Sequence, residues 1–138
     1  MHNRTGFDPD LEVFGEMQRF FDRSLEIATR AGIARARIVL DPGIGFGKTF
    51  DQNVQVLAGL ERLAAYGLPL LVGASRKGFI GRITGRAVPS ERLAGSLAAH
   101  MAAVQNGAAI IRAHDIAAHR DMLAMAAALK NQTAEPRT

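Results

Sequence analysis

The chain has no cysteine among its 138 residues, and aromatic residues make up only 6% of it. The lack of cysteine excludes disulfide bonds, thiolate zinc sites and a cysteine nucleophile. Basic runs with interleaved aromatic residues are also missing, so nucleic acid is not an expected partner. There is no stretch of about 18 apolar residues, and no apolar signal segment opens the sequence. We therefore expect a protein without membrane contact, located in the cytoplasm.

The remaining composition is that of a folded protein. Hydrophobic residues account for 48% and charged residues for 22% of the chain, which disfavours intrinsic disorder and collagen-like structure. The net charge of +4 and the pI near 10.3 favour anionic ligands. A length of 138 residues suits one domain. We expect this domain to span 1–138, with residues 131–138 forming a disordered tail.

Helical patterns alternate with short apolar segments along the chain. From Asp8 to Ala31 the apolar residues recur at helical spacing, with Asp8-Pro9 expected to start the helix and Gly32 to end it. Further helices are expected at 51–66, 79–83, 90–107 and 116–129, and strands at 37–40, 68–72 and 109–111. A helix followed by three strand–helix units predicts an α/β fold with a parallel sheet.

The unusual polar residues all follow the three expected strands. In α/β folds the carboxyl ends of parallel strands form the edge that faces the ligand. We therefore expect the loops 41–48, 73–78 and 112–115 to lie side by side and to carry the function.

The first of these loops, 41–48, has the sequence DPGIGFGK. A stiff turn holds the Asp41 carboxylate at the rim of the sheet, where it can bind a ligand. The alternative is an ordinary turn-forming or helix-capping aspartate. Gly47-Lys48-Thr49 also matches the end of a Walker phosphate-binding loop, but Pro42 occupies the position of the first required glycine and lacks an amide donor. The nucleotide-hydrolase interpretation is therefore disfavoured.

The second loop, 73–78, has the sequence GASRKG. Ser75, Arg76 and Lys77 offer one hydroxyl and two cations. Gly73 and Gly78 permit the close approach of a ligand, and the amides near Gly78 would face a carboxylate or phosphate at a helix start. The alternative is a solvated pair of basic side chains.

The third loop, 112–115, has the sequence RAHD. Arg112 and His114 lie two residues apart on an extended segment, so both project to the same side and can clamp an anion. The flat guanidinium can also lie over an aromatic ligand, and the histidine can donate to an oxyanion. The alternative is a buried salt bridge with Asp41 or Asp115.

The other histidines give no metal site. His100 and His119 lie within helical patterns, and we expect them to be surface or packing residues. Neither has a partner at the spacing of metal ligands.

Together the three loops closely resemble the dihydropteroate synthase family. The match rests on DPGIGFGK (41–48), GASRKGFIG (73–81) and RAHD (112–115), and PSERLAGSL (89–97) is similar to the helix that follows in the family. The resemblance runs from Met1 to about Leu129. It implies the fold of a TIM barrel and the joining of 6-hydroxymethyl-7,8-dihydropterin diphosphate to 4-aminobenzoate, with release of diphosphate and Mg²⁺ as the cofactor.

The resemblance also assigns roles to residues of this sequence. Asp41 would bind the amino-pyrimidine edge of the pterin, and Lys77 its carbonyl group. Arg112 would stack on the ring and bind diphosphate together with His114, so Lys77, Arg112 and His114 are the expected catalytic residues. The other expected substrate-binding residues are Phe46 and Gly73 in the pterin pocket, Ser75 and the backbone of Gly78 at the aminobenzoate carboxylate, and Met1 at the end of a preceding strand.

The resemblance further implies that the chain is the C-terminal half of a (β/α)8 TIM barrel, with three complete strand–helix units and a preceding helix. The metal-binding asparagine and diphosphate-binding arginine of the family belong to the other half, so we expect weak or no activity from this chain alone. Open strand edges and exposed apolar faces favour a homo-oligomer or pairing with a complementary half-barrel. Two hypotheses follow: a transferase of folate synthesis, or a non-catalytic half-barrel that binds pterins or anions.

Overall fold

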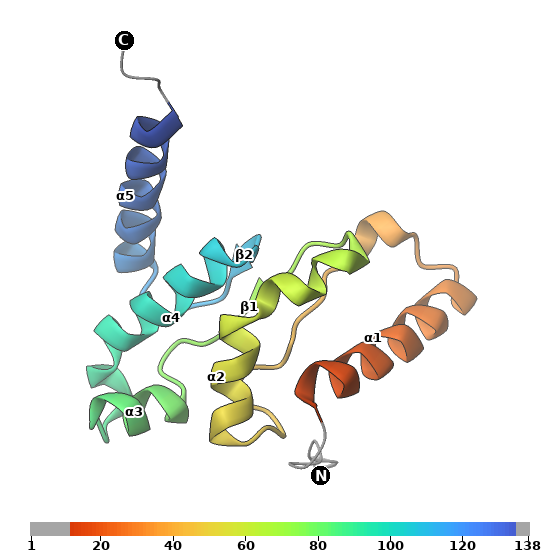
Figure 1. Ribbon diagram of the computed structural model, residues 1–138, viewed down its shortest axis with the longest axis horizontal. Helices are drawn as coiled ribbons and strands as arrows, with labels where there is room; N and C mark the ends of the chain where they lie inside the picture. Colours follow the sequence, from red (N-terminus) through yellow and green to blue (C-terminus); the bar gives the residue numbers. More distant parts are fainter. Residues whose placement is uncertain (1–11, 135–138) are drawn as a thin grey trace.

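The computed structural model describes residues 12–134, with side chains as far as residue 131. Its elements in chain order are α1 (Val13–Arg30), the 3₁₀ segment η1 (Arg35–Arg37), α2 (Phe50–Ala58), η2 (Leu60–Tyr66), β1 (Leu71–Val72), α3 (Gly78–Thr84), η3 (Pro89–Glu91), α4 (Leu93–Gln105), β2 (Ile110–Ile111) and α5 (Ile116–Ala134). In Figure 1, α1 lies on the right and α5 at the upper left, with α2 and α4 between them and α3 at the lower left.

A short parallel ladder lies among these helices. Strands β1 and β2 run in parallel, and the paired residues are Leu71 with Ile110 and Val72 with Ile111. On the other side of β1, Leu40 and Leu70 form an isolated parallel bridge. The three segments therefore lie side by side in chain order, and their carboxyl ends share one edge.

The first expected strand, 37–40, departs most from the sequence prediction. Arg37 belongs to η1, and only Leu40 takes part in the ladder. Arg35, also in η1, donates a hydrogen bond to the carbonyl of Tyr66, and this contact holds the chain in a turn ahead of the bridge. The other two strands are shorter than expected but lie within their predicted ranges.

Helix α1 begins later and ends where the sequence predicts. It starts at Val13, and the N-cap is Glu12, whose carboxylate accepts a hydrogen bond from the Gly15 amide at 2.8 Å. The expected start at 8–9 lies outside the described residues. At the other end Gly32 adopts a φ of +74° and closes the helix with the two backbone hydrogen bonds of a Schellman motif.

The helix expected over 51–66 is divided in two. Thr49 and Gln52 start α2 with a reciprocal capping box, and α2 gives way to η2 at Gly59. This glycine lies against the ring of Phe14, because a Cβ atom at Gly59 would be 3.0 Å from Phe14 Cζ. The change of winding alters which residues are buried: Val56, Leu57, Leu60 and Leu63 are buried, whereas Val54 and Ala64 are exposed.

Helix α4 also differs in its start and in its buried face. The expected cap, Ser90, lies in η3, and the helix begins at Leu93. The predicted apolar stripe, Leu93, Leu97, Met101 and Val104, is only half-buried, and the buried residues are Ser96, His100 and Ala103. Burial of the two polar side chains is tolerated because both are hydrogen-bonded to the loop after β1.

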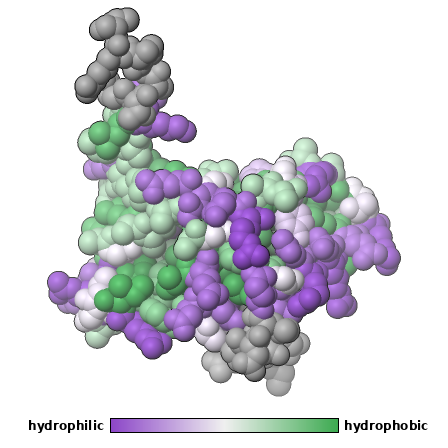
Figure 2. Space-filling model, in the orientation of Figure 1, coloured by the Kyte–Doolittle hydropathy of each residue, from purple (hydrophilic) through white to green (hydrophobic). Residues whose placement is uncertain are grey.

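The core lies where α1, α2 and η2 pack against the ladder. Its fully buried apolar side chains include Met17, Ile44, Val56, Leu60, Leu63 and Val72. Helix α5 extends to Ala134, so residues 131–134, expected to be part of a disordered tail, continue the helix. Figure 2 shows apolar side chains exposed along α5 and beside α3. Within residues 12–134 no helix is long and apolar enough to cross a membrane.

Candidate functional site

The three predicted loops meet at the carboxyl edge of the ladder. Arg112, directly after β2, joins them, because its Nη2 atom lies 3.6 Å from Oδ2 of Asp41 in the first loop. Its guanidinium also lies across the backbone of Gly73 in the second loop. A Cβ atom on Gly73 would be 2.7 Å from Arg112 Nη2 and 2.8 Å from Nε, so a side chain at this position would require the guanidinium to shift.

Asp41 and Arg112 form an exposed ion pair. Their side chains are 38% and 61% exposed. The alternative interpretation, a buried salt bridge with Asp41 or Asp115, is therefore correct about Asp41 as a partner but wrong about burial. The other oxygen of Asp41, Oδ1, accepts a hydrogen bond from the Gly43 amide at 2.8 Å, which is also the expected turn chemistry. An exposed pair of this kind contributes at most about 1 kcal/mol, so a ligand can open it at low cost.

Lys77 extends over the first loop. Its Nζ atom lies 4.0 Å from the ring centroid of Phe46, and its stem crosses Gly45, where a Cβ atom would be 2.9 Å from Lys77 Cδ. Burial and the nearby Arg112 guanidinium lower the pKa of Lys77 below its usual range, although Asp41 opposes this effect. Lys77, Arg112 and Asp41 therefore share one electrostatic environment, as the sequence predicts.

Two residues that the sequence analysis did not assign hold the first loop in shape. Lys48 Nζ donates to the carbonyl of Gly43 at 3.0 Å, and burial lowers its pKa to about 8. Asn53 is buried in α2, and its Oδ1 accepts a hydrogen bond from the Gly45 amide at 2.6 Å. A polar residue in the first turn of the helix after a glycine-rich loop is the signal that could have identified Asn53.

Ser75 is buried and positions His114. Its Oγ atom accepts a hydrogen bond from the His114 amide at 3.2 Å and lies 2.9 Å from His114 Nδ1. If the hydroxyl donates to Nδ1, the ring proton lies on Nε2, which has no hydrogen-bond partner within the described residues. The structure thus places the Ser75 hydroxyl on His114, and its expected contact with a carboxylate ligand stays a prediction.

Arg76 pairs with Asp115 instead of joining the cations of the site. Its Nε and Nη2 atoms lie 3.2 and 2.7 Å from the two carboxylate oxygens, and this hydrogen bonding lowers the pKa of Asp115. The backbone of Arg76 has a φ of +58°, a conformation that costs energy for a residue with a side chain. Helix α4 stabilises it: Ser96 Oγ accepts from the Arg76 amide, and Arg92 donates to its carbonyl, both at 2.9 Å.

A buried histidine pair lies behind the loops. His100 Nδ1 and His119 Nε2 are 2.8 Å apart, and the residues are 0% and 4% exposed. His100 Nε2 accepts a hydrogen bond from the Ala74 amide at 2.8 Å. The expectation that they are packing residues is confirmed, and the surface alternative is wrong. Their pairing could not be predicted because they belong to different helices, 19 residues apart in the chain.

The remaining predicted residues are placed as follows. Gly78 begins α3, and open space surrounds its Cα, since a Cβ there would meet nothing within 4 Å. Beside it lies a hollow of about 250 Å³ whose lining includes Gly45, Phe79 and Arg82. Met1 lies outside the described residues. The structure therefore brings together every predicted site residue that it describes: Asp41, Phe46, Gly73, Ser75, Lys77, Gly78, Arg112 and His114.

The described residues do not form a Mg²⁺ site. Within residues 12–134 there is no group of three or more histidine, aspartate or glutamate side chains that could hold a metal ion. Asp41 faces Arg112, and Asp115 is bound to Arg76. We therefore assign no step of the chemistry to a metal held by these residues.

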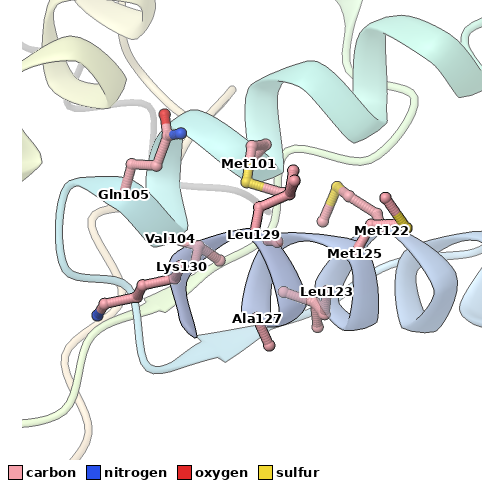
Figure 3. A pocket seen from close by; sticks show the side chains of 10 residues that line it. Met101, Val104, Gln105, Met122, Leu123, Met125, Ala127, Leu129 and Lys130 are labelled. Atoms are coloured by element: carbon pink, nitrogen blue, oxygen red, sulfur yellow. The ribbon is translucent and has the colours of Figure 1, made fainter. Parts of the chain in front are cut away.

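A second and larger hollow lies away from the loops, between α4 and α5. This groove has a volume of about 960 Å³, and Figure 3 shows Met101 and Val104 of α4 and Met122, Met125 and Leu129 of α5 along it. Its lining is almost entirely apolar. The charged chemistry therefore belongs to the loops and not to this groove.

Known proteins match this sequence and this geometry. The model of the family described as pterin binding enzyme matches residues 1–114. The chain belongs to this family. Dihydropteroate synthase of Synechocystis sp. is 42% identical over 129 residues, which make up 94% of this chain and 44% of the relative. The relatives are enzymes, and the resemblance to dihydropteroate synthase is confirmed.

Solved structures of this pterin binding family confirm the fold. Dihydropteroate synthase of Xanthomonas albilineans with 4-aminobenzoic acid superposes with a TM-score of 0.87 at 44% identity, over 98% of this chain and 47% of the other. The same enzyme in complex with 7,8-dihydropteroate gives a TM-score of 0.87 at 43% identity, over 99% and 50% of the two chains. The chain thus spans about half the length of the enzymes that it matches, as expected for a half-barrel.

Proposed function

We propose that the three loops form the pterin- and diphosphate-binding part of a dihydropteroate synthase. The reaction joins 6-hydroxymethyl-7,8-dihydropterin diphosphate to 4-aminobenzoate and releases diphosphate. The observation that carries the proposal is the meeting of Asp41, Lys77 and Arg112 with the Ser75–His114 pair at one edge of the ladder. The ligands present in the X. albilineans structures, 4-aminobenzoic acid and 7,8-dihydropteroate, are consistent with this assignment.

Groups of opposite charge bind the pterin ring. Asp41 presents Oδ2 to the amino-pyrimidine edge of the ring while its Oδ1 is fixed by the Gly43 amide. Lys77 donates to the ring carbonyl, and its lowered pKa makes its ammonium a readier proton donor. Arg112 lies flat on the ring once the ligand has opened its ion pair with Asp41. A rigid carboxylate and two cations thus match the donor and acceptor pattern of a pterin.

The chemical step breaks one bond and forms another at the methylene group of the pterin. The carbon–oxygen bond to diphosphate breaks with its electron pair on oxygen, the amine nitrogen of 4-aminobenzoate bonds to the carbon, and one amine proton is lost. Arg112 and the Nε2–H of His114 stabilise the negative charge that develops on the departing diphosphate. Ser75 contributes by fixing the orientation of the histidine.

The aminobenzoate carboxylate occupies the hollow at the start of α3. A Cβ atom at Gly78 would meet nothing within 4 Å there, so a ligand can approach the backbone. Arg82, whose guanidinium lies 4.2 Å from the ring centroid of Phe50, lines the same hollow. A carboxylate gains from both the free amides of a helix start and a nearby cation. The remaining groups of the site, including the ligands of a Mg²⁺ ion that would neutralise diphosphate charge, come from the other half of a complete barrel.

Calorimetric titration of the chain with the dihydropterin diphosphate tests this function. We expect micromolar binding, and the Lys77→Ala and Arg112→Ala variants should each weaken it by about tenfold or more, since each loses a charge-assisted hydrogen bond. Arg120→Ala, which removes an exposed charge from α5, is the matched control and should bind as the wild type does.

The outcomes separate the two functions. Binding followed by turnover with 4-aminobenzoate supports the transferase, and binding without turnover supports a non-catalytic pterin-binding half-barrel. Equal affinity in the wild type, Lys77→Ala and Arg112→Ala would place the ligand elsewhere. No binding by the folded chain would show that these loops alone do not hold the pterin.

We also propose that a second copy of this chain covers the groove between α4 and α5, because exposed apolar faces favour a homo-oligomer and this groove is lined mainly by apolar side chains. Met125 and Leu129 on α5 are 60% and 63% exposed. Sedimentation velocity should show a dimer that Leu129→Glu dissociates. The control Ile83→Glu changes a side chain of α3 that is equally exposed, at 60%, and should leave the dimer intact. A monomeric wild type would contradict the proposal.

A further inference from the structure

An unbroken series of three hydrogen bonds runs through the histidine pair. It begins at the Ala74 amide, which donates to His100 Nε2 at 2.8 Å. His100 Nδ1 lies 2.8 Å from His119 Nε2, and His119 Nδ1 lies 2.8 Å from the carbonyl oxygen of Asp115. The series therefore connects the loop after β1 with the loop after β2 through α4 and α5.

The two ends of the series determine where every ring proton lies. The Ala74 amide can only donate, so His100 Nε2 carries no proton and Nδ1 must carry it. His100 then donates to His119 Nε2, which leaves the His119 proton on Nδ1, where the Asp115 carbonyl accepts it. The three bonds use one amide proton and two ring protons. Two neutral imidazole rings supply these two ring protons, one from each ring. A further proton on either ring would set two donors against each other.

The burial of His100 supports its neutral state. Burial and the neighbouring His119 lower the pKa of His100 to about 4. The buried polar side chains of the described residues leave no nitrogen or oxygen without a hydrogen-bond partner. The pair is therefore a satisfied polar network, in which each member depends on the others.

The two ends of the hydrogen-bond series, Ala74 and Asp115, lie next to residues of the proposed site. Ala74 lies between Gly73, which supports the Arg112 guanidinium, and Ser75, which holds His114. Asp115 directly follows His114. The β1–β2 ladder ends with the hydrogen bond from the Arg112 amide to the Val72 carbonyl at 3.0 Å. Beyond it, in the described part of the chain, side chains make the direct contacts between the two loops, Ser75 with His114 and Arg76 with Asp115, and no hydrogen bond runs from backbone to backbone.

We propose that His100 and His119 are positioning residues, which fix the distance between the two anion-binding loops from behind and so align His114 with Arg112. The inference rests on the proposed function for its effect on binding, but the proton positions can be tested without any ligand. A histidine pair that only fills space would require no particular tautomer.

The first test is a two-bond ¹H–¹⁵N correlation spectrum of the wild-type chain near neutral pH. We expect both His100 and His119 to carry their proton on Nδ1 and to show an unprotonated Nε2. A proton on Nε2 of either residue, or a histidine pair that exchanges between tautomers, would overturn the proposal.

The second test compares two substitutions of His119. His119→Gln retains one acceptor and one donor, whereas His119→Leu retains the bulk and removes both hydrogen bonds. We expect His119→Leu to weaken the binding of inorganic diphosphate by about tenfold, corresponding to about 1.4 kcal/mol, and to shift the His114 ring signals, while His119→Gln stays close to the wild type. Met122→Ala, on the same helix but outside the series, is the control for lost packing.

The other outcomes of these two tests also decide for or against the positioning role. A folded His119→Leu chain with wild-type diphosphate affinity and unchanged His114 signals would overturn the positioning role. If His119→Leu does not fold, the wild-type spectrum and the His119→Gln variant decide instead. If the wild-type chain does not bind diphosphate, the proposed function fails, while the proton positions still establish or refute the connection between the loops.

Discussion

Arg112 lies close over a residue that has no side chain. Its guanidinium lies against Gly73, where any side chain would come within 2.7 Å of Nη2. Arg76, by contrast, keeps a side chain at a φ of +58° because Ser96 and Arg92 bind its backbone on both sides. At the scale of single residues, the site therefore depends on the close approach of Arg112 to Gly73. It also depends on a strained backbone at Arg76, whose cost the neighbouring hydrogen bonds offset.

Gly73→Ala should impair binding of the dihydropterin diphosphate. The added Cβ displaces the Arg112 guanidinium from its place over the ladder edge, so we expect the affinity to fall by about tenfold or more, as for loss of a charge-assisted contact. Titration calorimetry measures the effect. Gly15→Ala, where the new Cβ makes only an ordinary 3.4 Å contact, should bind like the wild type, and an unchanged affinity in Gly73→Ala would contradict the placement of Arg112.

The sequence predicts which residues lie at the site but not how they pair. Asp41, Lys77 and Arg112 could be assigned because each directly follows a predicted strand or its turn. The hydrogen bond between Ser75 and His114 could not be predicted, because these residues are 39 apart in the chain. The parallel pairing of β1 with β2 sets the distance between them. The turn of Arg76 toward Asp115 depends on the positive φ, which no local pattern signals.

Helix α4 approaches α3 at Gly95, and Gly81 in α3 leaves room for the loop that joins the two helices. A Cβ atom at Gly95 in α4 would be 2.4 Å from Ile80 Cγ2, and one at Gly81 in α3 would be 2.6 Å from the Arg86 carbonyl oxygen. This close packing places Ser96 and His100 against the loop after β1. At the scale of elements, the site loop is thus held by a helix pair in which small residues set the separation.

Gly95→Ala should destabilise the chain, although alanine normally favours a helix over glycine. The new methyl group overlaps Ile80, and overpacking of this kind costs about 1–3 kcal/mol, which exceeds the gain of about 1 kcal/mol in helix propensity. Urea denaturation measures the free energy of unfolding. The double variant Gly95→Ala/Ile80→Leu removes the Cγ2 methyl and should recover stability, whereas a stabilised Gly95→Ala chain would contradict the close packing.

The sequence patterns predict some helix ends correctly but miss a helix break and the buried face of one helix. The end of α1 at Gly32 was predictable, because a glycine after an amphipathic run favours a left-handed cap. The break at Gly59 was not, since it follows from the Phe14 ring packing against that glycine. The buried face of α4 was missed because Ser96 and His100 are polar and their partners lie in another part of the chain.

At the scale of the whole molecule, polar contacts join elements that the short ladder does not connect. The ladder is short, and many apolar side chains of α5 stay exposed. The loops, α4 and α5 are instead joined by the histidine pair and the Arg76–Asp115 ion pair. The stability of the fold should therefore depend on the protonation of His100 and Asp115.

The free energy of unfolding should decrease as the pH falls from about 6.5 to about 4. His100 has an ordinary pKa of 6.5, which burial lowers to about 4 in the folded chain. Between these values the unfolded chain binds a proton that the folded chain does not, so lower pH favours unfolding, by up to about 3 kcal/mol. Urea denaturation across this pH range tests the effect, and His100→Gln, which cannot titrate, should flatten it. The same slope in the variant would assign the pH dependence to other groups.

The central claim is that the three loops form one pterin- and diphosphate-binding site, and amide NMR spectra recorded during titration with the dihydropterin diphosphate test it most directly. We predict that the shifted amides gather in 41–48, 73–78 and 112–115, and that those of the α4–α5 groove, such as Met125, do not move. Shifts centred on that groove, or no shifts at saturating ligand, would contradict the account.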